Sequence, residues 1–333
     1  MFLVQKANLS SPFRSTTKKP PHIPKPYQLA AQLFDENIIL HLKTLDLPPD
    51  SSYITLSWLS AAVSFISTVH SEAELQISNL KPEADDFHDL YMDYSLKVLD
   101  LCNLISSAVN RLTDTRLLLN FSLRLLKFSD DLPPVEKLNK AKDAIARSVN
   151  SLNNINNNIN DTDESVKEKG IRVKKLINEL AVLIGNLPRG KVTDGIRRMF
   201  YATGVLTVFV GSVLVTVLYG ESDVVRQLRV PSEFVWADSV NGMENRIFDL
   251  IKFKKNVVKE VDDVVKQAVV VRDVIETVVN GGGDDGVRVC LQDGVKEMTV
   301  GAKKLSDGID KLTDGVNGMF RTVLKIRNGR LDV

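Results

Sequence analysis

The sequence predicts an all-α protein, folded as an elongated bundle of long amphipathic helices. Apolar residues recur at steps of three and four over long stretches, which is the spacing that lines one face of a helix. Aromatic residues make up only 6% of the 333 residues, while Val, Leu, Ile, Asp and Lys dominate. This composition favours helices with aliphatic contact faces and makes a β-sandwich a poor fit.

The first half of the chain contains several helix signals. A helix is expected directly after residues 50–52, whose side chains suit the capping of backbone N–H groups. A long helix follows over 83–127 and a shorter one over 135–149. The asparagine-rich segment 151–161 predicts a loop, because Asn side chains compete with the backbone for hydrogen bonds. Helical periodicity then resumes over 173–184.

Residues 199–220 form the sharpest local anomaly, with no charged side chain over 22 positions. A helix of roughly 20 apolar residues can cross the hydrocarbon core of a membrane. Basic residues precede the segment while Glu221 and Asp223 follow it, which would leave the N-terminal half in the cytosol. The glycines and hydroxyl residues within it suit a buried helix equally well. A membrane span, a buried core helix and a surface-lying helix all stay open.

The clearest pattern belongs to the last helix, where apolar residues follow one another at steps of four and three. The predicted interaction seam consists of Leu291, Val295, Met298, Leu305, Ile309, Leu312, Val316, Met319, Val323 and Ile326, and Ala302 fills the remaining step of the pattern. About five heptads of this kind require a facing helix, as in a coiled coil.

The expected facing helix is the valine-rich one predicted over 241–279. A glycine-rich hinge at 280–286 would let the two helices form an antiparallel hairpin. The alternative is a homo-oligomer that pairs the same seam between copies. Lys254 should be exposed at a hairpin end, whereas it would be costly deep in a symmetric seam.

The chain divides into four predicted parts. Residues 1–45 are expected to be a disordered basic tail, since five prolines and no Asp or Glu occur in 1–34. A cleavable transit peptide is the alternative. Residues 46–190 form an N-terminal helical region, 191–221 the apolar helix, and 222–333 the C-terminal helical hairpin.

The residue pattern assigns no catalytic, cofactor-binding or metal-binding residues. None of the four histidines has a metal-ligand spacing with Cys, Asp or Glu on one helix face. Cys102 and Cys290 lie too far apart in sequence to form a disulfide framework or a four-ligand zinc site. The formal net charge of +1 gives no field that would attract nucleic acid. We therefore expect no enzyme activity, no cofactor and no nucleic-acid partner.

A pair of carboxylates on the expected long helix is the rival candidate for a catalytic site. Asp93 and Asp100 lie seven residues apart on the expected long helix, beside Cys102 and Asn103. They would need a cavity to act as paired carboxylates. A solvated helix face, or ion pairs with nearby arginines, is the expected role of such residues on a helix surface.

Several segments resemble the BYPASS family of plant proteins. The most specific are the Ser57–Trp58 pair and LDLCN at 99–103. Two further segments follow in the family's order, GKVTDGIRRMFYATGVLTVFVGSVL at 190–214 and VPSEFVWADSV at 230–240. The resemblance covers about residues 35 to 333. It is weakest in the N-terminal tail and in the valine-rich segment 257–279, which leaves compartment and partner open.

The resemblance implies a non-enzymatic regulator of plant root and shoot development that restrains a root-derived mobile signal. It supplies no catalytic residues. Such a protein would act as a membrane-associated helical adaptor that binds a protein partner through its helical surface. Its expected location is the endomembrane system, with the cytoplasm or a plastid as alternatives. The rival functions are an enzyme or carrier that binds the signal precursor in a bundle cavity, a homo-oligomeric coiled coil, and an exocyst-linked trafficking scaffold.

Overall fold

The computed structural model has nine α-helices within the residues that it describes, and the predicted all-α fold class is confirmed. The described residues are 25–48, 51–80, 88–127, 132–155, 164–187, 195–220, 229–253, 257–281 and 285–331. The helices are α1 (Lys25–Leu42), α2 (Leu56–Leu80), α3 (His88–Leu125), α4 (Val135–Ile155), α5 (Glu164–Gly185), α6 (Gly195–Tyr219), α7 (Ala237–Phe253), α8 (Lys259–Val279) and α9 (Asp285–Leu331).

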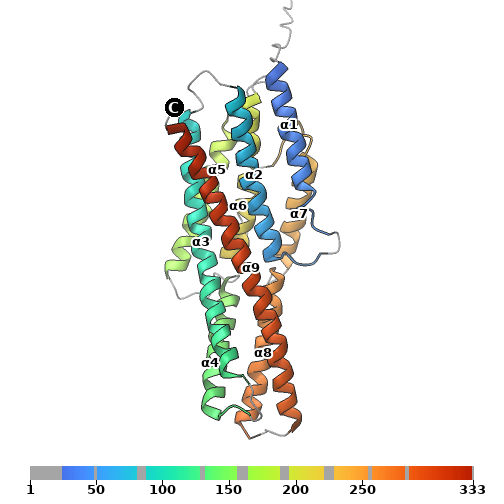
Figure 1. Ribbon diagram of the computed structural model, residues 1–333, viewed down its shortest axis with the longest axis vertical. Helices are drawn as coiled ribbons and strands as arrows, with labels where there is room; N and C mark the ends of the chain where they lie inside the picture. The colour runs from blue at the N-terminus through green and yellow to red at the C-terminus, as the bar shows by residue number, and fades with distance from the viewer. Residues whose placement is uncertain are drawn as a thin grey trace, which may run out of the picture.

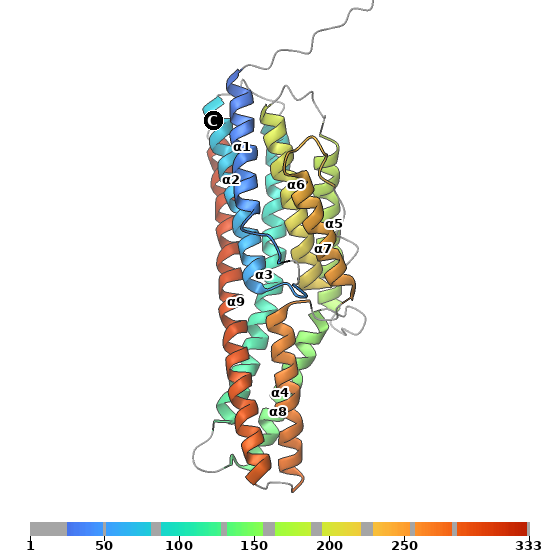
Figure 2. The same ribbon diagram turned by 90° about the vertical axis from the view of Figure 1, so that its right-hand side faces the viewer.

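The helices form a long bundle with a wide upper part and a narrower lower part (Figures 1 and 2). Two helices run through both parts, α3 and the 47-residue α9, which is about 70 Å long at 1.5 Å per residue. In the upper part they lie with α1, α2, α5, α6 and α7, and in the lower part with α4 and α8. The two long helices therefore hold the parts together.

The predicted C-terminal hairpin is present, because α8 and α9 pack side by side and run antiparallel (Figure 2). Gly281, in the turn after α8, has a φ of +98°, a conformation that favours glycine. α9 begins at Asp285, inside the expected hinge, and residues 282–284 lie outside the described residues. With only 21 residues, α8 faces less than half of α9, so α9 also packs against α2 and α3.

The prediction of one helix over 241–279 is wrong. The structure has two helices there, α7 and α8, and the backbone at Val258 is extended, with φ −88° and ψ 120°. Val258 forms an isolated parallel β-bridge with Ile54. Backbone pairing with a distant segment therefore replaces helix continuation at this point. Lys254 lies outside the described residues.

The prediction of a disordered tail over 1–45 is wrong for residues 25–45. These residues include α1, which packs against α2 and α6. Phe34, Ile38 and Leu42 are at most 4% exposed and follow at helical steps of four. Burial of this face stabilises the helix even though the flanking composition resembles a tail. Residues 1–24 lie outside the described residues.

The loop predicted over 151–161 is also wrong in its first part, because α4 extends to Ile155. Leu152 is completely buried and continues the apolar face formed by Leu138, Ala141, Ile145 and Val149. Burial of Leu152 outweighs the weak helix propensity of the neighbouring asparagines. Residues 156–161 lie outside the described residues.

The apolar helix α6 is the central helix of the upper part. It packs against α1, α2, α3 and α5, and 94% of its most apolar 18-residue window is buried inside the protein. Gly204 faces the Ile184 side chain of α5, and Gly211 faces Leu101 of α3 and Ile177 of α5. By length and composition α6 could also cross a membrane. Its packing in the structure is that of a core helix.

Candidate functional site

The predicted interaction seam lies inside the bundle. Nine of its ten residues are buried and Val295 is partly buried. The glycines of α9 show which helix covers each part of the seam. A Cβ at Gly301 would lie 3.2 Å from Val264 of α8, and one at Gly308 would lie 2.8 Å from Leu56 of α2. The seam is thus covered by the chain's own helices, and a partner could reach it only by displacing them.

Polar contacts fix the register of α9 beside the seam. The Ser60 hydroxyl of α2 donates to the Lys311 carbonyl at 2.8 Å, and the hydroxyls of Ser67 and Thr322 lie 2.9 Å apart. On the α3 side, Arg116 pairs with Asp310 at 2.6 Å. These contacts hold α9 against both α2 and α3. The same seam packs against α8 nearer the start of α9.

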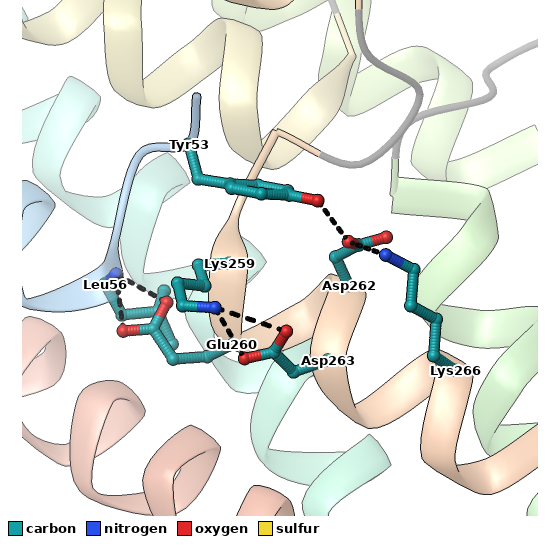
Figure 3. Close-up of polar contacts among 7 residues, drawn as sticks. All are labelled: Tyr53, Leu56, Lys259, Glu260, Asp262, Asp263 and Lys266. Atoms are coloured by element: carbon teal, nitrogen blue, oxygen red, sulfur yellow. Dashed lines mark hydrogen bonds and ion pairs between the residues drawn. The ribbon is translucent and has the colours of Figure 1, made fainter. Parts of the chain in front are cut away.

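The segment before α2 meets the segment before α8 at the junction between the upper and lower parts (Figure 3). The Ile54 N–H donates to the Val257 carbonyl and the Lys259 N–H donates to the Ile54 carbonyl, both at 2.9 Å. The Glu260 carboxylate accepts the Leu56 N–H at 3.1 and 3.2 Å. A carboxylate is favourable there, because the start of α2 carries a partial positive charge.

The helix cap of α2 differs from the expectation for residues 50–52. The Thr55 hydroxyl accepts the Trp58 N–H at 3.0 Å, and Glu260 supplies the second acceptor from a distant part of the chain. Beside it, the Tyr53 hydroxyl donates to Asp262 at 2.8 Å, and Lys266 also donates to Asp262 at 2.8 Å (Figure 3). The junction joins the two parts of the bundle.

Replacing Glu260 by alanine should lower the free energy of unfolding by about 1 to 2 kcal/mol, because the Leu56 N–H at the start of α2 loses its charged acceptor. Urea unfolding followed by circular dichroism measures the change. Asp263→Ala is the matched control, since Asp263 lies in the same helix turn and only pairs with Lys259 at 3.1 Å. That exposed pair contributes about 0.3 to 0.5 kcal/mol. Equal losses in the two variants would contradict the capping role of Glu260.

A buried polar cluster joins α2, α3 and α6 in the upper part. The Thr207 hydroxyl donates to the Thr203 carbonyl at 2.8 Å, and the Tyr94 hydroxyl donates to the Thr207 oxygen at 2.9 Å. His70 Nε2 lies 3.1 Å from the same Thr207 oxygen. With both hydroxyl protons used in these contacts, His70 Nε2 carries a proton and donates to the Thr207 oxygen.

Burial controls the ionisation of this cluster. It lowers the pKa of His70 from 6.5 to about 4 and raises the pKa of Tyr94 above its ordinary value. The cluster therefore keeps neutral groups in hydrogen bonds and links three helices. The sequence pattern predicted no role for His70, although its position four residues after Ile66 and three before Ala73 places it on an apolar helix face.

The rival carboxylate pair does not form a site. Asp93 and Asn103 are exposed, Asp100 is partly exposed, and Cys102 is buried on the other side of α3. Asp93 lies 3.9 Å from Lys97, one turn along the same helix. Burial raises the pKa of the Cys102 thiol to about 12, so the reactive thiolate is not populated near neutral pH. Within the described residues no three His, Cys, Asp or Glu side chains could hold a metal ion.

An apolar groove of about 760 Å³ runs along the outer face between α3 and α5. Its lining includes Leu90 of α3 and Ile171, Val182 and Leu183 of α5. Ile171 is 68% exposed and Val182 is 60% exposed, and both lie on the same groove. Lys97 crosses the groove and donates to Glu179 at 3.0 Å. The sequence pattern did not predict this groove.

A second groove, of about 640 Å³, lies beside α1, the start of α6 and the segment before α7. The buried Asp35 carboxylate accepts from Arg198 at 2.7 Å and from the Trp236 indole N–H at 2.9 Å. The Arg198 guanidinium also lies 4.1 Å from the centre of the Phe234 ring. Three distant segments are thereby fixed together, so these groups act in the fold rather than toward a ligand.

Comparisons with known proteins identify relatives of this chain. A family model described as Protein ROH1-like matches residues 172–333, which include α6 to α9. UPF0496 protein 4 from Oryza sativa, in both subspecies indica and japonica, is 27% identical over 251 residues, or 72% of this chain and 51% of the relative. Protein BPS1, chloroplastic, from Arabidopsis thaliana is 25% identical over 228 residues, or 66% of this chain and 60% of the relative. The chain is therefore similar to BYPASS-type plant proteins over about two thirds of its length.

The recognition made from the sequence segments is therefore confirmed. The chain spans about half the length of the rice relatives that it matches, at 51%, and 60% of the Arabidopsis relative. No solved structure matches the chain. Arg198, Trp236 and Glu260, which join distant segments of the fold, all lie inside the region matched by the family model.

Proposed function

We propose that this BYPASS-like chain is a non-enzymatic regulator of root and shoot development that acts as a helical adaptor and restrains a root-derived mobile signal. The developmental role comes from the resemblance to the BYPASS family, with which the relatives agree. The adaptor role is supported by one observation. The α9 seam is buried by other helices of the same chain, whereas the apolar groove between α3 and α5 is open on the outer surface.

Binding fits the arrangement of side chains better than catalysis does. An enzyme or carrier function would need the polar side chains on α3 to converge on one site. They do not, because Cys102 is buried whereas Asp93, Asp100 and Asn103 lie at the surface. General acid–base chemistry needs such groups to converge on one reacting atom. An exposed apolar groove on a firmly packed scaffold instead suits a protein partner. An oligomer built through the α9 seam would require the chain to open first.

Membrane association forms part of the proposal, through the bundle surface or through a partner. α6 is the alternative anchor, but its transfer to lipid would break several contacts. The Tyr219 hydroxyl donates to the Leu104 carbonyl at 2.6 Å, and Arg111 donates to the Leu218 carbonyl at 3.0 Å. The endomembrane system is the proposed location. The printed name of the Arabidopsis relative, chloroplastic, supports a plastid as the alternative.

Reciprocal grafting tests the proposed role. Wild-type shoots grafted onto the roots of mutant plants, which lack the chain, should stop growing early. The reason is that the unrestrained signal moves upward from the root. Mutant shoots on wild-type roots should grow normally. Shoot growth is measured, and mutant roots that express the wild-type chain serve as the control. Normal shoots on mutant roots, or arrested mutant shoots on wild-type roots, would show that the chain does not restrain a root signal.

A further inference from the structure

We propose that the groove between α3 and α5 binds an amphipathic helix of a protein partner that carries acidic side chains beside its apolar face. This inference rests on the proposed adaptor function and names the class of partner. Two features of the groove support it: a stripe of exposed apolar side chains and a basic rim.

The apolar stripe has the length of a short helix. On α5, Ile171, Val182 and Leu183 line the groove, and Leu187 lies at its end. From Ile171 to Gly185, where α5 ends, the helix spans about 21 Å at 1.5 Å per residue. An amphipathic helix of four to five turns presents apolar residues along about that length. The length and the exposure of Ile171 and Val182 therefore fit a helix laid along α5.

The rim of the groove carries a net positive charge. Lys97 enters from α3, whereas Lys174 and Lys175 come from α5. Glu179 is the one acidic residue in the lining of this groove, and it pairs with Lys97 at 3.0 Å and Lys175 at 3.8 Å. A partner with acidic residues on its flanks would gain from this charge, and a basic partner would be repelled.

The test is a display library of 18-residue amphipathic helices with randomised polar positions, selected against the full chain. Selected sequences should be enriched in Asp and Glu on both flanks. Affinities of the labelled peptides are measured by fluorescence anisotropy. Val182→Asp should weaken binding at least 10-fold, and Lys175→Glu at least 3-fold.

Val270→Asp is the matched control, because Val270 of α8 is 55% exposed and lies in the lower part of the bundle. It should leave peptide affinity unchanged. Circular dichroism should show equal helix content in Val182→Asp and the wild-type chain, since Val182 is 60% exposed. A loss of binding in Val182→Asp then reports on the groove rather than on folding.

Three results would overturn the inference: no enrichment, enrichment of Lys and Arg on the flanks, or equal affinity of the selected peptides for the wild type and Val182→Asp. Vesicles of phosphatidylserine and phosphatidylcholine form a separate arm. Vesicle binding that Val182→Asp abolishes would assign the groove to a lipid surface instead of a helix. If the chain restrains the root signal in grafts but binds no such peptide, the proposed function stands and the proposed partner class is wrong.

Discussion

Replacing Gly204 by leucine should lower the free energy of unfolding by about 3 kcal/mol, the upper range for an overpacked core. A side chain at Gly204 would overlap Ile184, which is completely buried on α5. Leucine has the better helix propensity by about 1 kcal/mol, so a net loss must come from packing. Urea unfolding followed by circular dichroism measures the effect.

Gly318→Leu is the matched control, because a Cβ at Gly318 on α9 meets nothing within 4 Å. Gly318→Leu should leave stability unchanged or raise it. Combining Gly204→Leu with Ile184→Ala should recover more than 1 kcal/mol relative to the sum of the two single changes, because the new side chain fills the vacated space. Additive losses would show that Gly204 and Ile184 do not touch.

The same variant separates the two interpretations of α6. In a core helix, the overlap destabilises the folded bundle. In a helix that faces lipid, Gly204→Leu would only add apolar surface and strengthen insertion. Alkaline carbonate extraction, combined with protease protection of the chain tagged at each end, gives the second measurement. Two results together would contradict the core-helix interpretation: a wild-type chain that resists carbonate extraction, and a Gly204→Leu variant with unchanged stability.

Acidification should remove about 3 kcal/mol from the free energy of unfolding between pH 6.5 and pH 4 because of His70 alone. Burial lowers the pKa of His70 to about 4 in the folded chain, against 6.5 when it is unfolded. Between these values the unfolded chain binds a proton that the folded chain excludes. The contribution of neutral His70 is therefore complete above pH 6.5 and is lost as the pH falls toward 4.

Urea unfolding at several pH values, with His70→Gln beside the wild type, isolates this contribution. His70→Gln keeps a side-chain donor for Thr207 and should lose the extra acid dependence between pH 6.5 and 4. His41→Gln is the control, since His41 lies at the edge of the bundle and pairs with Glu72 at 3.3 Å. The wild type and His41→Gln should share the steep decline. Identical curves for His70→Gln and the wild type would refute the role of His70.

The sequence predicted the features that depend on local periodicity. Steps of three and four marked α2, α3, α5 and α9, because amphipathic helices of this length require one apolar face whatever they pack against. The heptads from Leu291 to Ile326 specified a buried seam for the same reason. The recognition of the BYPASS family also came from the sequence, through segments such as 99–103 and 230–240.

Other features depended on contacts that no local pattern contains. α1 forms because Phe34 and Ile38 are buried against distant helices. The helix expected over 241–279 breaks because Val258 pairs with Ile54, about 200 residues earlier in the chain. The groove between α3 and α5 exists because two helices 82 residues apart at Lys97 and Glu179 lie side by side.

The amino-acid sequence by itself determined the class of fold, the family resemblance and the apolar faces of the long helices, since each follows from residues close together in the chain. Only the tertiary structure decided what covers each face. It placed α6 at the centre and filled the α9 seam with α2, α3 and α8, but left α5 with an open apolar groove. The physical reason is that helical periodicity specifies which side chains avoid water, while the choice of neighbour depends on the shape and charge of surfaces far away in the sequence.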